Sequence, residues 1–224
     1  MSGPSTARAV LWDMDGTLLD STEYHWLAWR AALRVEGIKL SYDRFLASFG
    51  QRNDTILRGH FGRAIPAAEI ERIGDAKEER YRALVRERGI ALLPGVERWL
   101  KRLHAEGWRQ AIASAAPRAN VDTILAIVGA GACFDAIVSA EDVQQGKPDP
   151  QVFVRAAERL SVPPARCIVV EDAPPGIEAA HRAGMRAIGV RTSHPGLEAD
   201  IAVRTLDALP EDAFEALLRW RTRT

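Results

Sequence analysis

From residue 91 onward, short runs of apolar and β-branched residues alternate with amphipathic helical stretches. This alternation is typical of βαβ units, in which helices connect the parallel strands of a sheet. The predicted strands are Gln110–Ser114, Ala136–Ser139, Cys167–Glu171, Arg186–Val190 and Ile201–Arg204, and Val10–Asp13 completes the sheet. The pattern therefore predicts an α/β fold around a parallel sheet.

Residues 19–91 interrupt this alternation. They are helical in period and charge, most clearly over Thr22–Val35 and Ala67–Arg88, and contain no candidate strand. A helical block inserted after the first strand is expected to form a cap near the carboxyl ends of the strands, where open α/β sheets bind ligands. We predict a Rossmann-like α/β core domain of residues 1–18 and 92–224, an inserted helical cap domain of residues 19–91, and hinge linkers at Leu18–Ser21 and Gly89–Pro94.

Composition and charge exclude several classes of protein. Hydrophobic residues make up 47% and charged residues 27% of the chain, close to the averages of globular proteins. Thirty basic residues balance thirty acidic ones, which gives no electrostatic reason to expect nucleic acid or an anionic membrane as partner. Residues 1–7 lack a signal-peptide pattern, and no apolar run approaches the roughly 18 residues of a membrane helix. We expect a cytoplasmic monomer whose cysteines, Cys133 and Cys167, are buried reduced thiols.

Two carboxylates, Asp13 and Asp15, stand two residues apart at the end of the apolar run 9–12. Ionised carboxylates leave water only when they are paired or bound to a metal, so an acid pair in this position indicates a cation or a reaction. The alternative is a strand that ends in an acidic turn, where Asp and Gly serve turn geometry. These residues alone leave both interpretations open.

Three further polar features fall at strand ends: Ser114, Lys147 in the string Gly-Lys-Pro-Asp-Pro, and Glu171 followed by Asp172. Because the carboxyl ends of parallel strands meet at one edge of a sheet, these groups could converge on the first acid pair. A hydroxyl, an ammonium and several carboxylates together have the chemistry of a magnesium-dependent phosphoryl-transfer site.

The order of these features, from Asp-Met-Asp-Gly-Thr at residues 13–17 through Ser114 and Lys147 to the acid pair at 171–172, resembles the haloacid dehalogenase superfamily of phosphotransferases. The resemblance covers nearly the whole chain. Residues 146–150 and 170–180 look like signature strings of the branch that contains small-metabolite phosphatases and β-phosphoglucomutase, and the helical insertion matches that branch. The resemblance implies an enzyme.

By this resemblance, Asp13 is the nucleophile that forms an aspartyl phosphate. Asp15 is the general acid, protonated at first, and later the base toward water. Lys147 and Mg²⁺ would keep Asp13 ionised and offset its repulsion from a phosphate dianion. The implied magnesium ligands are Asp13, Asp172 and the backbone carbonyl of Asp15, with Glu171 as a further ligand or as an anchor for bound water.

A phosphate cradle is expected near Ser114, which we predict to be the N-cap of a helix that runs through Ile127. Backbone N–H groups at such a helix start bind phosphate together with the capping hydroxyl. By resemblance, Thr17 and Ala115 line the same cradle.

Structural alternatives remain open for three of these residues. Asp172 could cap the helix that starts near Pro175. Glu171 could be a solvent-facing strand end, and Lys147 a solvated surface lysine. The prolines after Lys147 favour a stiff loop that positions its charge, and a cis Lys147–Pro148 bond is compatible with that loop.

The cap is expected to select the substrate, because the core motifs recognise only the phosphoryl group. His25 and Trp29 lie four residues apart on one helix face and resemble a His/Trp pair of the β-phosphoglucomutase cap; the alternative for both is core packing. Arg52 resembles a residue of the cap loop that reaches the site, where its planar guanidinium could bind a second anion. The alternative is a solvated charge.

The loop before Gly50 bears on the reaction. β-Phosphoglucomutase carries a lysine there, whereas this chain has Ala-Ser-Phe at residues 47–49, and fewer cationic groups favour water as the phosphoryl acceptor. We predict a Mg²⁺-dependent phosphatase acting on a small phosphorylated metabolite such as a sugar phosphate. The alternatives are a β-phosphoglucomutase-like phosphotransferase and a non-catalytic phospholigand-binding protein; a dehalogenase would use neither Asp15 nor a magnesium cluster. The sequence does not identify the substrate.

Overall fold

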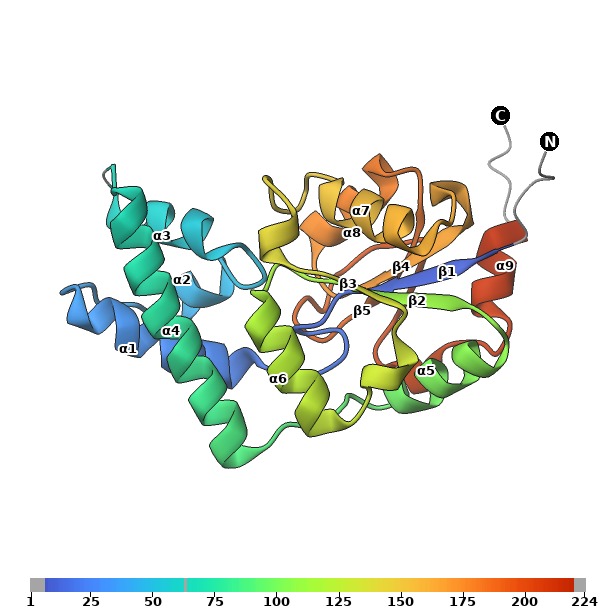
Figure 1. Ribbon diagram of the computed structural model, residues 1–224, viewed down its shortest axis with the longest axis horizontal. Coiled ribbons are helices and arrows are strands. Elements are labelled where there is room, and N and C mark those ends of the chain that lie inside the picture. Colours follow the sequence, from blue (N-terminus) through green and yellow to red (C-terminus); the bar gives the residue numbers. More distant parts are fainter. Residues whose placement is uncertain (1–6, 63, 220–224) are drawn as a thin grey trace.

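Six parallel strands form one sheet in a computed structural model that describes residues 7–62 and 64–219 (Figure 1). The strand order is β3-β2-β1-β4-β5-β6. The strands are β1 (Ala9–Trp12), β2 (Arg109–Ala113), β3 (Ala136–Val138), β4 (Cys167–Glu171), β5 (Arg186–Val190) and β6 (Ile201–Val203). The predicted α/β fold with a parallel, Rossmann-like sheet is confirmed.

Four predicted strands end one residue earlier than expected, before Asp13, Ser114, Ser139 and Arg204. The first two of these residues still donate their N–H groups to the neighbouring strand: Asp13 to the Val170 carbonyl and Ser114 to the Val138 carbonyl, each at 3.0 Å. They therefore stand at the edge of the sheet with their positions set by it.

Helices cover both faces of the sheet. Val10 and Trp12 of β1 pack with α5 (Val96–Ala105), α6 (Arg118–Val128) and α9 (Ala213–Arg219). The alternate residues Ala9 and Leu11 face α7 (Gln151–Leu160) and α8 (Pro174–Arg182) on the other side. Short 3-10 turns at Gly131–Cys133, Ala140–Asp142, Pro164–Arg166 and Leu206–Ala208 complete this part. Burial on both faces explains why its strands are continuous apolar runs in the sequence.

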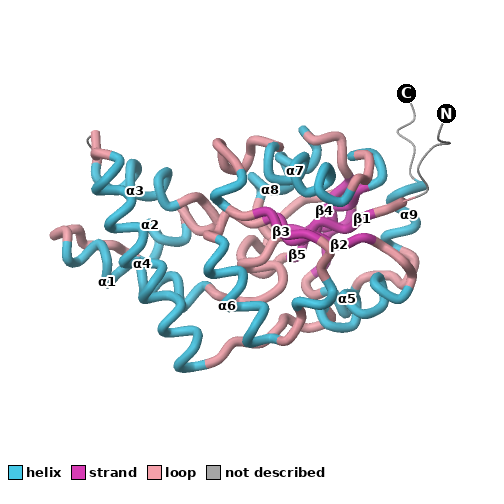
Figure 2. Tube along the Cα trace, in the orientation of Figure 1, coloured by secondary structure: helices cyan, strands magenta, loops and turns pink. Residues whose placement is uncertain are grey.

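The chain forms a block of helices after β1 and before β2, and this block lies to one side of the sheet (Figure 1). It consists of α1 (Thr22–Val35), α2 (Tyr42–Leu46), α3 (Asn53–Phe61) and α4 (Ala67–Arg88), and Figure 2 shows helix and loop without strand there. The predicted bounds of α1 and α4 are confirmed. A separate apolar cluster holds the block together, with Trp29, Leu33, Phe45, Leu57 and Ile73 among its members. The division into a core domain of residues 1–18 and 92–224 and a cap domain of residues 19–91 stays a prediction, and residues 1–6, 63 and 220–224 lie outside the described residues.

The two crossings between sheet and helical block lie side by side. The Leu93 N–H donates to the Leu18 carbonyl at 2.9 Å, and Leu19 forms an antiparallel bridge with Leu92. The chain therefore enters and leaves the block at one place, as the predicted hinge linkers require.

The predicted N-cap at Ser114 is wrong, and the structure also rules out the alternative in which Asp172 caps a helix. α6 begins at Arg118 with Pro117 in the N-cap position, because residues 115–117 first form a turn; Ser114 Oγ instead accepts a hydrogen bond from the Ala116 N–H at 3.1 Å. α8 begins at Pro174, where proline is favoured in the first turn, and its N-cap is Ala173, so Asp172 does not cap it. Both polar side chains remain available to the site.

The cysteines are both free thiols; Cys167 is buried as expected, but Cys133 is half-buried, which corrects that prediction. The Cys133 turn follows the end of α6, at the edge of the sheet. Within the described residues, no helix combines the length and the apolar character that crossing a membrane requires.

Candidate active site

The site lies at the carboxyl ends of the central strands, under the helical block. Asp13 follows β1 and Asp172 follows β4, the pair of strands between which the strand order reverses, where open α/β sheets bind ligands. A cavity of about 140 Å³ opens beside Asp13 and Asp172. Its core-side lining contains Asp13, Asp15, Ser114, Ala115, Lys147, Glu171, Asp172 and His194, and its cap-side lining includes His25, Trp29, Phe45, Phe49, Gln51, Asn53, Lys77 and Glu78.

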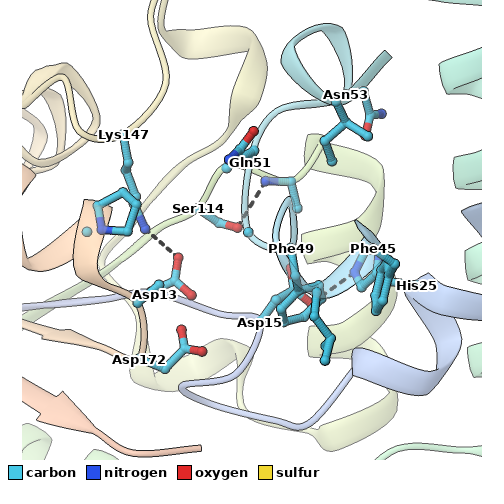
Figure 3. Close-up of a pocket in the computed structure, with 18 of the residues that line it drawn as sticks. Asp13, Asp15, His25, Phe45, Phe49, Gln51, Asn53, Ser114, Lys147 and Asp172 are labelled. Atoms are coloured by element: carbon cyan, nitrogen blue, oxygen red, sulfur yellow. Dashed lines mark hydrogen bonds and ion pairs between the residues drawn. The ribbon is translucent and has the colours of Figure 1, made fainter. Parts of the chain in front are cut away.

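Three buried carboxylates converge on the core side. Asp13, Glu171 and Asp172 each place a carboxylate oxygen within 4.8 Å of the others. The Lys147 ammonium donates to Asp13 Oδ1 at 2.5 Å and to Glu171 Oε1 at 2.7 Å (Figure 3). Lys147 is therefore a buried partner of the acids and not a solvated surface lysine; its peptide bond to Pro148 is cis. We call these four residues the acid cluster.

The acid cluster holds three carboxylates against one ammonium, and its pKa values reflect that imbalance. Burial and the neighbouring Glu171 raise the pKa of Asp13 to about 7, although Lys147 opposes them. Burial, Glu171 and Asp13 raise the pKa of Asp172 well above its ordinary value. Burial alone would lower the pKa of Lys147, but the two carboxylates it contacts raise it, so the ammonium stays charged. The cluster lacks positive charge.

Two glycines allow the carboxylates to pack this closely. Gly16 has φ +90°, and a Cβ there would lie 2.1 Å from Asp172 Oδ2. A Cβ at Gly176 would lie 1.9 Å from Glu171 Oε1. Glu171 is 2% exposed, and its Oε2 accepts from the Ala173 N–H at 2.7 Å, so it is not a solvent-facing strand end.

Asp15 belongs to a second polar group, shared with the helical block. Its Oδ1 accepts hydrogen bonds from Ser21 Oγ at 2.5 Å and from His25 Nε2 at 3.2 Å. Lys77 Nζ lies 2.8 Å from His25 Nδ1 and 2.8 Å from Glu78 Oε1. An ammonium only donates, so His25 Nδ1 accepts and its Nε2–H points to Asp15. We call Asp15, His25, Lys77 and Glu78 the cap cluster.

The cap cluster has two carboxylates and one ammonium, and hydrogen bonds from His25, Ser21 and two amides satisfy the carboxylates. Glu78 accepts from Asn53 at 2.8 Å and, through its other oxygen, from Asn120 at 2.6 Å. Burial raises the pKa of Glu78, but Lys77 and the amide of Asn120 outweigh burial and lower it. Burial likewise raises the pKa of Asp15, yet His25, the Ser21 hydroxyl and the charge of Lys77 lower it overall. Asp15 is therefore a carboxylate in this structure, which differs from the protonated state expected at the start of the reaction.

Some of the residues predicted for the cap and for the phosphate cradle line the cavity, and others do not. His25 contacts Asp15, and Trp29, 2% exposed, lines the cavity and also packs in the apolar cluster of the block. Ser114 and Ala115 line the cavity as expected. Thr17 is fully buried outside the lining, and its hydroxyl donates to Asp172 Oδ1 at 3.4 Å, so the structure gives it a carboxylate and not a place in the cradle.

Arg52 does not line the cavity. Its guanidinium donates to the carbonyls of Ala140 at 2.6 Å and Val143 at 3.1 Å, and to Asp54 at 3.3 Å. Core carbonyls thus accept from Nη1 of Arg52, and its expected contact with a second substrate anion stays a prediction. Arg52 is also not a freely solvated charge.

Sequence reasoning missed Lys77, Glu78, Tyr81 and His194. Tyr81 is fully buried, and its ring stacks on His25 with the centroids 4.0 Å apart. A signal existed for the lysine: Ile73, Lys77 and Tyr81 recur every four residues, which places the lysine on the apolar face of α4. No comparable pattern marks His194, whose Nδ1 lies 3.1 Å from the Asp172 carbonyl.

The donor set of the acid cluster fits a hard divalent cation. Magnesium prefers carboxylate oxygens and needs only one or two of them beside water and substrate phosphate. The raised pKa values of Asp13 and Asp172 show that the site is short of positive charge, and a cation would supply it. Among the described residues, no donor reaches Asp13 Oδ2, so this oxygen is free to contact a ligand.

The chain matches known proteins over most of its length. The family model "haloacid dehalogenase-like hydrolase" matches residues 7–184. A β-phosphoglucomutase of Bacillus subtilis is 36% identical over 221 residues, covering 92% of this chain and 95% of the relative. A fructose-1-phosphate phosphatase of Escherichia coli is 31% identical and covers 81% of this chain and 95% of the relative. The crystal structure of a β-phosphoglucomutase from Clostridium difficile superposes with a TM-score of 0.86 at 27% identity, covering 95% of this chain and 97% of that one.

Proposed function

This chain belongs to the haloacid dehalogenase-like hydrolases, and on that premise we propose that it is a Mg²⁺-dependent phosphatase of a small phosphorylated metabolite. The observation that carries the proposal is the state of Asp13. One of its oxygens is held by Lys147 at 2.5 Å, the other has no donor among the described residues, and Asp13 lines the cavity. A carboxylate held in this way is positioned to attack phosphorus.

The proposed reaction has two steps on Asp13. In the first, Asp13 Oδ2 attacks phosphorus, the ester oxygen leaves, and an aspartyl phosphate forms. In the second, water attacks this phosphate and releases Asp13. Lys147 stabilises the charge that develops on the phosphoryl oxygens, and the Ser114 hydroxyl and the Ala115 backbone provide further donors on the opposite side of the cavity.

Asp13 and Asp172 are the carboxylates that would hold Mg²⁺, with the carbonyl of Asp15 as the third protein ligand proposed from the family resemblance. Bound magnesium would neutralise phosphate charge and lower the pKa values of both carboxylates. Both Glu171 oxygens already accept hydrogen bonds, from Lys147 and from Ala173, which favours Glu171 as the residue that anchors the lysine and bound water.

Asp15 is proposed as the acid and base of the reaction. Its ionised state suits the base role toward water in the second step. For the first step it needs a proton, and the approach of a phosphate dianion favours protonation of the carboxylate because like charges repel. His25 and Ser21 hold Asp15 in place through both steps.

The charges of the cavity favour a phosphatase over a mutase. Among the lining residues of the described chain, the lysines are Lys77 and Lys147, and both are paired with buried carboxylates. Arg52 is bonded to core carbonyls. A mutase must bind a second phosphate, and no lining cation is left for it, so we propose a monophosphate ester as substrate and water as acceptor.

A phosphate-release assay tests the proposal. Sugar, nucleotide and glycolate monophosphates would be offered with and without Mg²⁺. Asp13→Asn would be compared with Asp122→Asn, a change at an exposed acid that pairs with Arg118. We expect Mg²⁺-dependent release by the wild type and by Asp122→Asn, and none by Asp13→Asn. Equal release by Asp13→Asn would overturn the proposed nucleophile.

The same assay separates the alternatives. If glucose 1-phosphate with a bisphosphate primer turned over faster than any ester was hydrolysed, the protein would be a mutase. Tight phosphate-ester binding with Mg²⁺ but no release across the panel would indicate a binding protein.

A further inference from the structure

Arg52 connects the helical block to the core. It is the N-cap residue of α3, yet its guanidinium donates to two carbonyls of the core, those of Ala140 at 2.6 Å and Val143 at 3.1 Å. Ala140 begins the 3-10 turn Ala140–Asp142, and Val143 follows it. The guanidinium presents five donors in a rigid plane, and here one amine of the fork reaches both acceptors. The side chain is 21% exposed, so these hydrogen bonds are largely shielded from water.

A glycine accommodates the stem of this arginine. A Cβ at Gly146 would lie 2.8 Å from Arg52 Cδ and 3.1 Å from Cγ, and the three nearest atoms it would meet all belong to Arg52. Gly146 is absent from the residues with positive φ, so its backbone is compatible with alanine. An alanine at this position would therefore clash with the side chain of Arg52.

The core segment held by Arg52 leads directly to Lys147. Residues 140–146 run from the 3-10 turn to the lysine, and the turn that follows is closed by a hydrogen bond from the Asp149 N–H to the Gly146 carbonyl at 3.0 Å. On the other side, Gln51 and Asn53, the neighbours of Arg52, line the same cavity as Ser114 and Lys147 (Figure 3). A change at Arg52 therefore acts on both walls of the cavity at once.

We propose that Arg52 is a positioning residue that seats the cap on the Lys147 segment, and that Gly146 provides the space its side chain needs to do so. Arg52 acts through the segment that carries Lys147 and through its own cap loop, without touching the substrate. For the reaction it serves, the proposal rests on the proposed phosphatase function. It replaces the expectation that Arg52 binds a second substrate anion.

A double-mutant cycle tests the contact. The variants are Arg52→Ala, Gly146→Ala and the two combined. The matched controls are Arg58→Ala, at an exposed arginine of the same helix that pairs with Asp54, and Gly59→Ala, where a Cβ meets nothing within 4 Å. Kinetics would be measured with an alkyl and an aryl monophosphate, and hydrogen exchange of segments 50–54 and 140–146 would be followed in parallel.

We expect Arg52→Ala to lower kcat/KM for the alkyl ester about tenfold, the loss of roughly one shielded hydrogen-bonded contact. The effect on the aryl ester should be smaller, because its leaving group needs little protonation from the cap-held Asp15. Exchange should become faster in both segments. Gly146→Ala should lower kcat/KM several-fold in the wild-type background. In the Arg52→Ala background it should cause no further loss, because the atoms with which the new Cβ would clash are then absent.

Two results would overturn the proposal. One is an equal loss of kcat/KM on Gly146→Ala in the wild-type and Arg52→Ala backgrounds, and the other is an unchanged hydrogen-exchange rate in segments 50–54 and 140–146 of Arg52→Ala. A selective loss of bisphosphate substrates would show instead that Arg52 is a substrate ligand. Wild type that releases no phosphate from any ester would refute the proposed function, whereas the exchange measurement would still decide the Arg52 contact.

Discussion

The acid cluster and the cap cluster are both buried polar groups around one cavity, but their charge balance differs. The acid cluster has three carboxylates and one ammonium, and the pKa values of Asp13 and Asp172 are raised. The cap cluster pairs Lys77 with Glu78 and His25 with Asp15, and the pKa values of both its carboxylates are lowered. Only the first cluster is incomplete without a ligand.

This difference separates binding from positioning. Buried like charges are tolerated where a cation or a substrate supplies the missing charge, and such strained groups concentrate at functional sites. A network whose carboxylates are satisfied by hydrogen bonds, and whose carboxylate pKa values are lowered, has no such need and instead fixes geometry. We infer that the acid cluster performs the chemistry and the cap cluster orients Asp15.

The largest expected effect is on the nucleophile. Asp13→Asn should lower kcat by about 10⁴-fold or more, since removal of a nucleophile leaves only binding and electrostatic contributions. Single-turnover measurement of phosphate release checks this. Residual activity within tenfold of wild type would mean that the acid cluster does not hold the nucleophile.

The second-largest effect is expected from removal of the metal. Chelation with EDTA is expected to abolish phosphate release, and added Mg²⁺ should restore it, because Asp13 and Asp172 otherwise repel the phosphate. Mg²⁺ should also raise Tm, since it binds the folded acid cluster. In Asp172→Asn the rise in Tm should be smaller than in wild type; an equal rise would place the ion elsewhere.

Asp15→Asn should lower kcat for alkyl esters by about 10²–10⁴-fold, the usual contribution of a general acid or base. For aryl esters, formation of the aspartyl phosphate should survive, because the leaving group needs little protonation. A burst of phenol followed by slow turnover would demonstrate this. Equal losses in the burst rate for both ester types would contradict the role of Asp15.

The cap cluster should matter most for folding. Lys77→Met leaves Glu78 buried without its ammonium, and removal of one partner of a buried pair costs about 3–5 kcal/mol. Lys101→Met, at an exposed ion pair, should leave the unfolding free energy close to that of the wild type. Urea unfolding of both variants decides the point. In contrast, Asp13→Asn should stabilise the metal-free protein, because it removes an unbalanced charge.

The smallest effect concerns pH. The folded-state pKa of Glu78 lies below its ordinary value of 4.5, so its contribution to stability is fully present above that pH and is lost as the pH falls through the folded pKa. Unfolding free energies of wild type and Glu78→Gln should therefore converge on acidification below pH 4.5. Parallel curves would show that Glu78 does not titrate differently on folding.

The sequence predicted the sheet and the core residues of the site well, for a physical reason. The strands are apolar because helices cover both faces, and Asp13, Ser114 and Asp172 stand where the ladder ends, so the order of the sheet brings them together. The errors were local. Ser114 and Asp172 do not cap helices, because a turn at residues 115–117 and the residue Ala173 intervene.

The sequence by itself therefore determined the parallel sheet, the inserted helices and the residues of the acid cluster, since strand period and position at a strand end are local properties. Only the tertiary structure decided which polar groups far apart in the sequence pair with one another. His25 meets Lys77, 52 residues away, and Arg52 meets the Ala140 carbonyl, 88 residues away. Such contacts depend on how α1, α3 and α4 pack over the sheet edge, and no local pattern records that packing. The expected ligand of Arg52 was a substrate anion, and the fold supplied backbone carbonyls.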